Sequence, residues 1–238
     1  MEDMFSRSRA LLGEAALSKL RGSSVIVFGL GGVGSFTAEA LARSGIGALT
    51  LVDGDTVSES NINRQLCALH STVGCDKAAV AASRLADIAP ECRITPVKAV
   101  YLPENAGEFD LSAFDYVADA IDTVSAKLEL AVRSEAAGVP LISCMGTGNK
   151  LDPTLLRVSD ITKTEVCPLC RVMRRELRAR GVAHLKCVWS PEAPAKPKDD
   201  IPSGSPSRHA PASMMFVPAS AGILMAKEII CDIIGDLL

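Results

Sequence analysis

The sequence contains no uncharged apolar run of the roughly eighteen residues that a membrane-spanning helix requires. Its N-terminal stretch, MEDMFSRSRALLGE, is charged and lacks the apolar core of a secretion signal. We therefore expect a cytoplasmic protein with no membrane partner. With 48% hydrophobic and 22% charged residues over 238 positions, the chain is expected to bury a sizeable core.

Regular cysteine spacing is also missing. The eight cysteines are placed irregularly, unlike those of a secreted disulfide scaffold, so reduced thiols are expected. Cys167 and Cys170 form one C-x-x-C pair, whereas a structural zinc site usually needs four ligands. Only Cys187 and Cys231 follow in the sequence, so we do not expect structural zinc. Cys187 lies in an apparent strand, LKCVW, where a buried thiol is a simpler interpretation than a reactive one.

Histidine is scarce. The only histidines are His70, His184 and His209, and none has an evident partner for acid–base chemistry. This scarcity disfavours an NAD-dependent oxidoreductase that relies on a histidine acid. Such an enzyme remains an alternative, because its cofactor would use the glycine-rich turn described next.

What the chain does contain is a complete strand–helix–strand unit in residues 24–65. Residues 25–28, VIVF, are typical of a short buried parallel strand, and four glycines follow at positions 29, 31, 32 and 34. A helix is expected from residue 34, and a second strand over residues 48–52 ends at Asp53. Such a turn lets the backbone approach a phosphate, and the acid can hold ribose hydroxyls. The unit predicts a nucleotide site.

The polar residues beyond Asp53 indicate which nucleotide is bound. Asn61, Arg64 and Gln65 follow the strand, and Lys77 opens the next expected helix. A nicotinamide needs no such cations near its ribose, whereas a triphosphate attacked at its α-phosphorus needs positive charge around the pyrophosphate. The arrangement favours ATP.

Strand and helix patterns continue to alternate after this unit. We expect helices over residues 75–89 and 125–137 and strands over residues 93–97, 116–120 and 141–145. This order predicts an α/β fold, a Rossmann-like, doubly wound and mainly parallel sheet with helices on both faces, plus a C-terminal extension. Ligands bind at the carboxyl ends of such strands. One crevice should therefore collect four sequence features: Asp53, Asp119, Asp122 and the loop at residues 146–150.

The expected organisation is a single ATP-binding domain over residues 1–238. It comprises an N-terminal arm (1–22), a nucleotide-binding core (23–150) and a substrate-binding and dimerisation extension (151–238). Within the extension, residues 155–158 resemble a strand, residues 168–180 a helix, and residues 218–238 a docked helix or subunit interface. Residues 190–212 hold six of the thirteen prolines and are expected to form an exposed loop.

Several motifs together resemble the adenylyltransferase family that includes ubiquitin-activating enzymes and their bacterial relatives in molybdopterin and thiamine synthesis. They are GLGGVG at 29–34, DGD at 53–55, SNINRQ at 60–65, Lys77, and DAID at 119–122. Within that family the chain is most similar to the tRNA threonylcarbamoyladenosine dehydratases, in EALARSGIGALTLVD, NINRQ, DAIDTVSAK, GNKLDPT and VMRRELRARG. The resemblance covers most of residues 5–189.

The resemblance implies ATP and Mg²⁺ as cofactors and a homodimer. It assigns catalysis to Arg64 and Lys77, which stabilise phosphate charge, and to Asp122, which handles magnesium. Hard carboxylate oxygens suit that ion. The residues expected to bind the nucleotide are Gly29, Gly31, Gly32, Gly34, Asp53, Asp55, Ser60, Asn61, Arg64, Gln65, Lys77, Asp122 and Thr123.

Two of these assignments have open alternatives. Asp122 would instead cap the next helix if that helix began directly after it, and Asp119 is expected to be structural. The family often has asparagine where this chain has Thr123, which leaves that ATP contact open.

The N-terminal arm is expected to supply one more catalytic arginine. In the family, an arginine six residues before a glycine reaches the ATP phosphates of the partner subunit. Arg7 has this spacing to Gly13, and Arg9 is a nearby competitor. The alternative is a solvated surface arginine.

A basic helix follows in the extension. Between residues 171 and 186 there are six Arg or Lys residues and one acid, in a chain whose net charge is -3. A polyanion such as RNA would gain from this charge, although a charge run is often only a solvated face. We expect tRNA contacts from Arg171, Arg174, Arg175 and Arg178.

The expected enzyme is a cyclising, AMP-forming ligase. Its substrate by resemblance is threonylcarbamoyladenosine in tRNA, whose threonyl carboxylate is adenylated and then closes into a ring with loss of water. One alternative is an adenylyltransferase for the C-terminal glycine of a sulfur-carrier protein, which would make a carrier or sulfur-transfer protein the partner. A second alternative is a non-catalytic nucleotide-binding protein.

Overall fold

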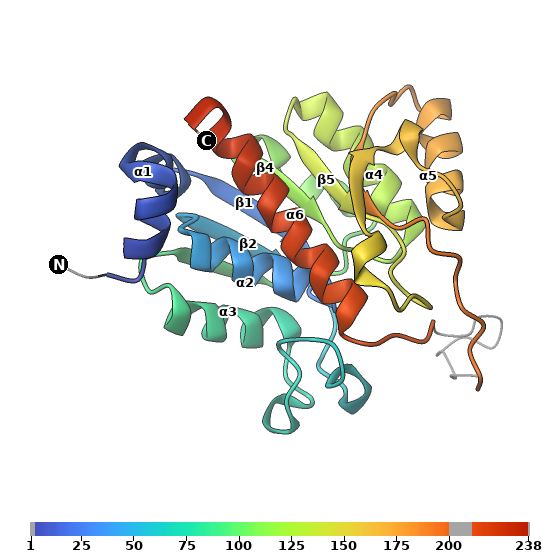
Figure 1. The fold of residues 1–238 in the computed structure, drawn as a ribbon, viewed down its shortest axis with the longest axis horizontal. Helices are drawn as coiled ribbons and strands as arrows, with labels where there is room; N and C mark the ends of the chain where they lie inside the picture. The colour runs from blue at the N-terminus through green and yellow to red at the C-terminus, as the bar shows by residue number, and fades with distance from the viewer. Residues whose placement is uncertain (1–2, 200–210, 238) are drawn as a thin grey trace.

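A computed structural model describes residues 3–199 and 211–237 (Figure 1). Its middle layer is a seven-stranded sheet in the order β3-β2-β1-β4-β5-β7-β6. The strands are β1 Ser24–Phe28, β2 Ala48–Val52, β3 Arg93–Val97, β4 Tyr116–Asp119, β5 Leu141–Cys144, β6 Arg157–Asp160 and β7 Lys186–Trp189. Only the β6–β7 pair within this sheet is antiparallel. The prediction of a mainly parallel α/β sheet is confirmed.

Helices cover both faces of this sheet (Figure 1). They are α1 Ser6–Arg21, α2 Gly34–Ser44, α3 Lys77–Ile88, α4 Val124–Ala137, α5 Pro168–Ala179 and α6 Phe216–Ile234. The first three and α6 share one core cluster with Val25 and Val27 of β1. Ile26 and Phe28 face the opposite layer, where they pack with α4. The apolar run in β1 is thus buried on both faces, as a central parallel strand requires.

Short helical turns connect these elements. They are η1 Glu59–Asn61, η2 His70–Thr72, η3 Ala106–Glu108, η4 Leu111–Ala113, η5 Pro153–Leu155, η6 Ile161–Lys163 and η7 Gly235–Leu237. The predicted start of one strand is wrong. The strand expected from residue 155 begins at Arg157, because Asp152 accepts the Thr154 N–H and the chain forms the turn η5 first.

The ends of the chain also differ in detail from expectation. The helix α1 is interrupted at Gly13, where φ is 81° and ψ is 165°. The last helix begins at Phe216 rather than at Pro218, because proline is tolerated in the first turn of a helix. Residues 193–199 are exposed, as expected for the proline-rich loop, and residues 200–210 of that loop lie outside the described residues. No helix in the described part is long and apolar enough to cross a membrane.

Candidate nucleotide site

The glycines in the turn between β1 and α2 differ in what surrounds them. Gly29 has a φ of +85°, and a Cβ there would lie 2.7 Å from the Ala120 carbonyl oxygen. A Cβ on Gly34 would lie 1.7 Å from the Gly29 carbonyl oxygen, so neither position accepts a side chain. At Gly31 the nearest atom to such a Cβ is Gln65 Nε2, 3.9 Å away. Gly29 and Gly34 are therefore required for packing, whereas Gly31 leaves open space above the turn.

Asp53, directly after β2, holds this turn in place. Its Oδ2 accepts the Leu30 N–H at 2.6 Å, and its Oδ1 accepts the Asp55 N–H at 2.9 Å. One carboxylate thus joins the glycine turn to the D-G-D segment. Contact between Asp53 and a ribose stays a prediction.

The loop that follows brings Arg64 and Gln65 to the glycine turn. A Cβ on Gly32 would lie 3.4 Å from Arg64 Cγ, and Gln65 is buried beside Gly31. The Arg64 Nη1 group donates to the Ser60 carbonyl at 2.9 Å and to Asn63 Oδ1 at 2.9 Å. The guanidinium is therefore held at the edge of the turn.

Asn61 and Ser60 have structural contacts in the same loop. The Asn61 Oδ1 accepts the Ser58 N–H at 3.2 Å, and its carbonyl accepts the Arg64 and Gln65 N–H groups, both at 3.0 Å. The hydroxyls of Ser58 and Ser60 lie 3.1 Å apart. Asn61 thus closes the loop that presents Arg64, and its direct contact with a nucleotide stays a prediction.

The end of β4 contributes two acids with different environments. Asp119 is fully buried, with one oxygen 2.9 Å from Lys127 Nζ and hydrogen-bonded to the Ser143 hydroxyl. Its expected structural role is confirmed. Asp122 is exposed and accepts the Thr123 hydroxyl at 3.3 Å. Because Thr123, not Asp122, is the N-cap of α4, the capping alternative for Asp122 is wrong.

The Asp122 carboxylate fits the requirements of a magnesium ion that accompanies ATP. Its hard oxygen ligands are exposed, and it follows by two residues Ala120, whose carbonyl packs on Gly29. Among the described residues there is no group of three or more metal-ligand side chains. Magnesium commonly binds through one or two carboxylates, with water and phosphate oxygens completing its shell.

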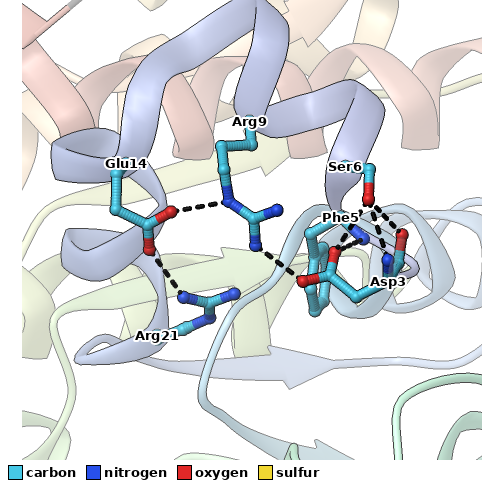
Figure 2. Close-up of polar contacts among 6 residues, drawn as sticks. All are labelled: Asp3, Phe5, Ser6, Arg9, Glu14 and Arg21. Atoms are coloured by element: carbon cyan, nitrogen blue, oxygen red, sulfur yellow. Dashed lines mark hydrogen bonds and ion pairs between the residues drawn. The ribbon is translucent and has the colours of Figure 1, made fainter. Parts of the chain in front are cut away.

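Arg7 does not join this site within its own chain. Arg9, its competitor, donates to Asp3 at 2.7 Å and to Glu14 at 2.6 Å, and Glu14 also accepts from Arg21 at 3.0 Å (Figure 2). Arg7 is exposed, two residues from Phe5. The Phe5 ring packs against Gly45 at the C-terminal end of α2, whereas the glycine turn lies at the N-terminal end of that helix.

The basic helix α5 is only partly available to a ligand. Arg171, Arg175 and Arg178 are exposed, and Arg175 lies 2.8 Å from Glu176. Arg174 instead turns back, donating to the Thr164 carbonyl at 2.8 Å and to the Thr164 hydroxyl. The Nη1 group of Arg174 therefore fastens α5 to the preceding loop, and the expected contact of Arg174 with tRNA stays a prediction.

The cysteines near α5 are buried. A hydrogen bond from the Cys170 thiol holds the pKa of Cys167 well below its usual range and raises the pKa of Cys170. Burial raises the pKa of Cys187 to about 12. The prediction of a buried strand thiol at Cys187 is confirmed.

Comparison with known proteins agrees with the motifs. The ThiF family matches residues 5–236. Over its full length the chain is 40% identical to the tRNA threonylcarbamoyladenosine dehydratase of Bacillus subtilis, covering 97% of that protein. It is 36% identical to the crystal structure of the E. coli tRNA N6-threonylcarbamoyladenosine dehydratase in complex with ATP, with a TM-score of 0.86 and coverage of 97% of this chain and 93% of that one.

A third relative matches only part of the chain. The molybdopterin-synthase adenylyltransferase of Salmonella typhimurium is 42% identical over 55% of this chain and 51% of its own length. The glycine turn, the D-G-D segment and the loop with Arg64 thus occur in a chain whose similarity to known proteins confirms the resemblance inferred from its motifs. The protein belongs to the ThiF family.

Proposed function

We propose that this protein is an ATP-dependent tRNA threonylcarbamoyladenosine dehydratase. The observation that carries the proposal is the extent of the similarity. Identity to the Bacillus subtilis dehydratase runs through the whole chain, including α5, whereas similarity to the molybdopterin-synthase adenylyltransferase covers 55% of it. The part of the chain that the adenylyltransferase does not match therefore also resembles a protein named for a tRNA substrate.

The first reaction joins the threonyl carboxylate to AMP. A carboxylate oxygen attacks the α-phosphorus of ATP, the bond to the β-phosphate oxygen breaks, and pyrophosphate leaves. Negative charge grows on the departing phosphates, so fixed cations beside the glycine turn accelerate the step. Arg64 and Lys77 supply that charge from the same chain, and Arg7 supplies it from a partner subunit.

Asp122 would hold the magnesium ion that travels with ATP. When bound, the ion neutralises charge on the phosphate oxygens. The exposure of Asp122 supports this role, since its carboxylate is not committed to capping α4.

The second reaction closes a ring. A nitrogen or oxygen of the modified side chain attacks the activated carboxyl carbon, the bond to AMP breaks, and one proton is released. The nucleoside has then lost one water, while ATP has become AMP and pyrophosphate. No external nucleophile is needed, which agrees with the raised pKa of Cys187.

The tRNA would lie along the exposed side of α5. Arg171, Arg175 and Arg178 present charge there, and phosphate contacts supply much of the affinity for RNA. A cytoplasmic homodimer completes the proposal, because the arm that carries Arg7 lies away from its own glycine turn.

Mass spectrometry of nucleosides tests the reaction directly. After incubation of tRNA with the protein, ATP and magnesium, threonylcarbamoyladenosine should lose the mass of one water, and AMP should appear in equal amount. If the nucleoside is unchanged while a small protein with a C-terminal glycine becomes adenylated, the carrier-protein alternative replaces this proposal. Binding of ATP without either product would identify a non-catalytic nucleotide-binding protein.

A further inference from the structure

Asn149 has an unusual backbone conformation and an unusual set of partners. Its φ is +59°, a region that few residues other than glycine adopt. Its N–H donates to the Ala212 carbonyl at 2.7 Å, and its Oδ1 accepts the Ala212 N–H at 2.8 Å. Its carbonyl accepts the Ala195 N–H at 2.7 Å. One residue in the loop after β5 thus binds two other segments through three hydrogen bonds.

The first of these segments, residues 190–195, lies along the loop that contains Asn149. The buried Lys150 ammonium donates to the Ser190 carbonyl at 3.0 Å. The Glu192 carboxylate accepts the Leu151 N–H at 2.9 Å and the Asp152 N–H at 3.1 Å. Side chains and backbone groups therefore fasten this segment at several points, independently of Asn149.

The second segment, residues 211–213, has fewer attachments and connects two parts of the site. We call it the crossing segment. On one side it is held by Asn149, and Pro211 packs so closely on Gly148 that a Cβ there would lie 2.6 Å from Pro211 Cβ. On the other side, Asn63 Nδ2 donates to the Ser213 carbonyl at 2.9 Å.

The Asn63 side of the crossing segment belongs to the nucleotide site. Asn63 Oδ1 also accepts from Arg64 at 2.9 Å, so the same carboxamide contacts the crossing segment and a predicted phosphate-binding arginine. The chain then enters α6, where Pro218 packs on the glycine turn: a Cβ added to Gly32 would lie 3.2 Å from Pro218 Cβ. The crossing segment therefore joins the loop after β5 to the glycine turn and its arginine.

We propose that Asn149 is a positioning residue for the tRNA substrate, which fixes the crossing segment as the wall between the loop after β5 and the nucleotide. This inference rests on the proposed function. Adenylation needs the threonyl carboxylate held close to the α-phosphorus, and a wall on that side of the crevice restricts where the modified adenosine can lie. Nucleotide binding depends less on Asn149. The side of the crossing segment that faces the glycine turn is held by Asn63, and the turn itself is contacted by Arg64 and Pro218.

The choice of asparagine fits this role. Asparagine tolerates positive φ better than most side chains, and its Oδ1 gives the second hydrogen bond to Ala212 that glycine cannot. A residue other than glycine keeps a positive φ where the surrounding contacts fix its backbone, and such residues are frequent at functional sites.

Two substitutions at position 149 separate the side-chain contact from the backbone conformation. Asn149→Gly keeps the positive φ and removes Oδ1, whereas Asn149→Asp keeps the acceptor. Asp110→Gly is the matched control, because Asp110 Oδ1 accepts the Ser112 N–H at 3.1 Å in a turn that leads into the opposite, amino-terminal end of β4. Each full-length protein is compared with wild type in steady-state dehydration of tRNA and in tryptic cleavage after Lys198, which lies between the two fastened segments.

Asn149→Gly should raise the KM for tRNA about threefold to tenfold, with the KM for ATP changed less than about twofold, as expected for one lost hydrogen bond. Cleavage of Asn149→Gly after Lys198 should be faster than in wild type, while Asn149→Asp and Asp110→Gly should be cleaved at the wild-type rate. The inference fails if Asn149→Gly leaves the KM for tRNA unchanged, if the KM for ATP rises equally, or if Asn149→Asp is cleaved as fast as Asn149→Gly. If wild-type protein does not alter tRNA at all, the proposed function fails instead, whatever the cleavage pattern.

Discussion

The Lys77 ammonium lies 2.8 Å from Asp55 Oδ2, yet the Lys77 side chain is 7% exposed and the Asp55 side chain is 69% exposed. Lys77 begins α3, and its N–H also donates to the Asp55 carbonyl at 3.0 Å. Burial of its stem fixes the direction of the ammonium before any ligand arrives, and a fixed cation needs little reorganisation when charge develops nearby. Asp55 is the solvent-exposed partner, so a phosphate can approach the pair or displace the Asp55 carboxylate.

Loss of this cation should impair catalysis strongly. Lys77→Met keeps most of the apolar stem but removes the charge, and a charge-assisted hydrogen bond contributes roughly 1.5–3 kcal/mol. We expect kcat/KM for ATP to fall about tenfold to a hundredfold in the AMP-release assay. Lys98→Met is the control, because Lys98 forms a 2.7 Å pair with Asp76 but is 58% exposed. Equal activity of the two variants would contradict the assignment.

Two substitutions in the glycine turn distinguish glycines that packing requires from glycines that leave space for the nucleotide. Gly34→Ala would place a Cβ 1.7 Å from the Gly29 carbonyl oxygen, so the backbone must move. We expect it to destabilise the protein by about 1–3 kcal/mol in urea unfolding and to abolish ATP binding in calorimetry. Gly31→Ala meets no atom closer than 3.9 Å and should keep wild-type stability. It should nevertheless weaken ATP binding, because its methyl group enters the open space; wild-type affinity in Gly31→Ala would place the phosphates elsewhere.

Local patterns in the sequence were sufficient to predict the sheet and the glycine turn. The strand over residues 93–97 was predicted with the observed limits, because a short β-rich run between turn signals is a local feature. The rule that parallel strands end at one edge predicted the placement of Asp53 and Asp119, since β2 and β4 end beside the same residue of β1; a crevice shared with Asp122 stays a prediction.

Side-chain partners distant in sequence were not predictable in this way. Asp119 was expected to be structural, but its partners Lys127 and Ser143 come from α4 and β5, and no spacing links them to it. Helical spacing likewise cannot show that the Arg174 guanidinium bends back to Thr164. Asn149 gave no signal of its role, since its positive φ and its contact with Ala212 depend on the assembled fold.

The different environments of the arginines in α5 predict two different effects of charge changes. Arg171→Glu combined with Arg178→Glu should weaken tRNA binding about tenfold or more at low salt, with a shallower dependence on salt concentration. ATP binding should be unchanged. Arg174→Ala should instead lower the melting temperature, because the Thr164 carbonyl loses its donor.

Filter binding of tRNA at several salt concentrations checks the first effect. The control changes Lys19 and Arg93, both exposed and outside α5, to Glu. If this control weakens tRNA binding as much as the α5 variant, the effect is one of net charge and α5 is not the contact surface.

The buried thiol pair predicts a dependence of stability on pH. The Cys170 thiol stabilises the Cys167 thiolate and holds the pKa of Cys167 below the value of about 8.5 for an unfolded thiol. Stability from this group is therefore fully present above that value and is lost as the pH falls through the folded pKa. Urea unfolding between pH 8 and pH 5 should show a larger loss of stability in wild type than in Cys167→Ala. Cys75→Ala, at an exposed thiol, should follow wild type; identical curves for Cys167→Ala and wild type would contradict the lowered pKa.

The position of Arg7 predicts that two subunits share each active site. Arg9 and Arg21 are held by acids of the arm (Figure 2), whereas Arg7 is exposed, and the arm lies away from its own glycine turn. Arg7→Ala and Lys77→Ala should each be nearly inactive alone. When the two variants are unfolded together and refolded at equal concentration, about half of the dimers are mixed. In a mixed dimer, the site with intact Lys77 receives the intact Arg7 of the other subunit, and the second site lacks both groups. Activity should therefore recover to about one quarter of the wild-type value, as random pairing of two subunits requires.

If Arg7 acted within its own chain, each site would lack one group and mixing would restore nothing. Arg9→Ala mixed with Lys77→Ala gives the control, because Arg9 has intramolecular partners and its loss should leave Arg9→Ala largely active before mixing.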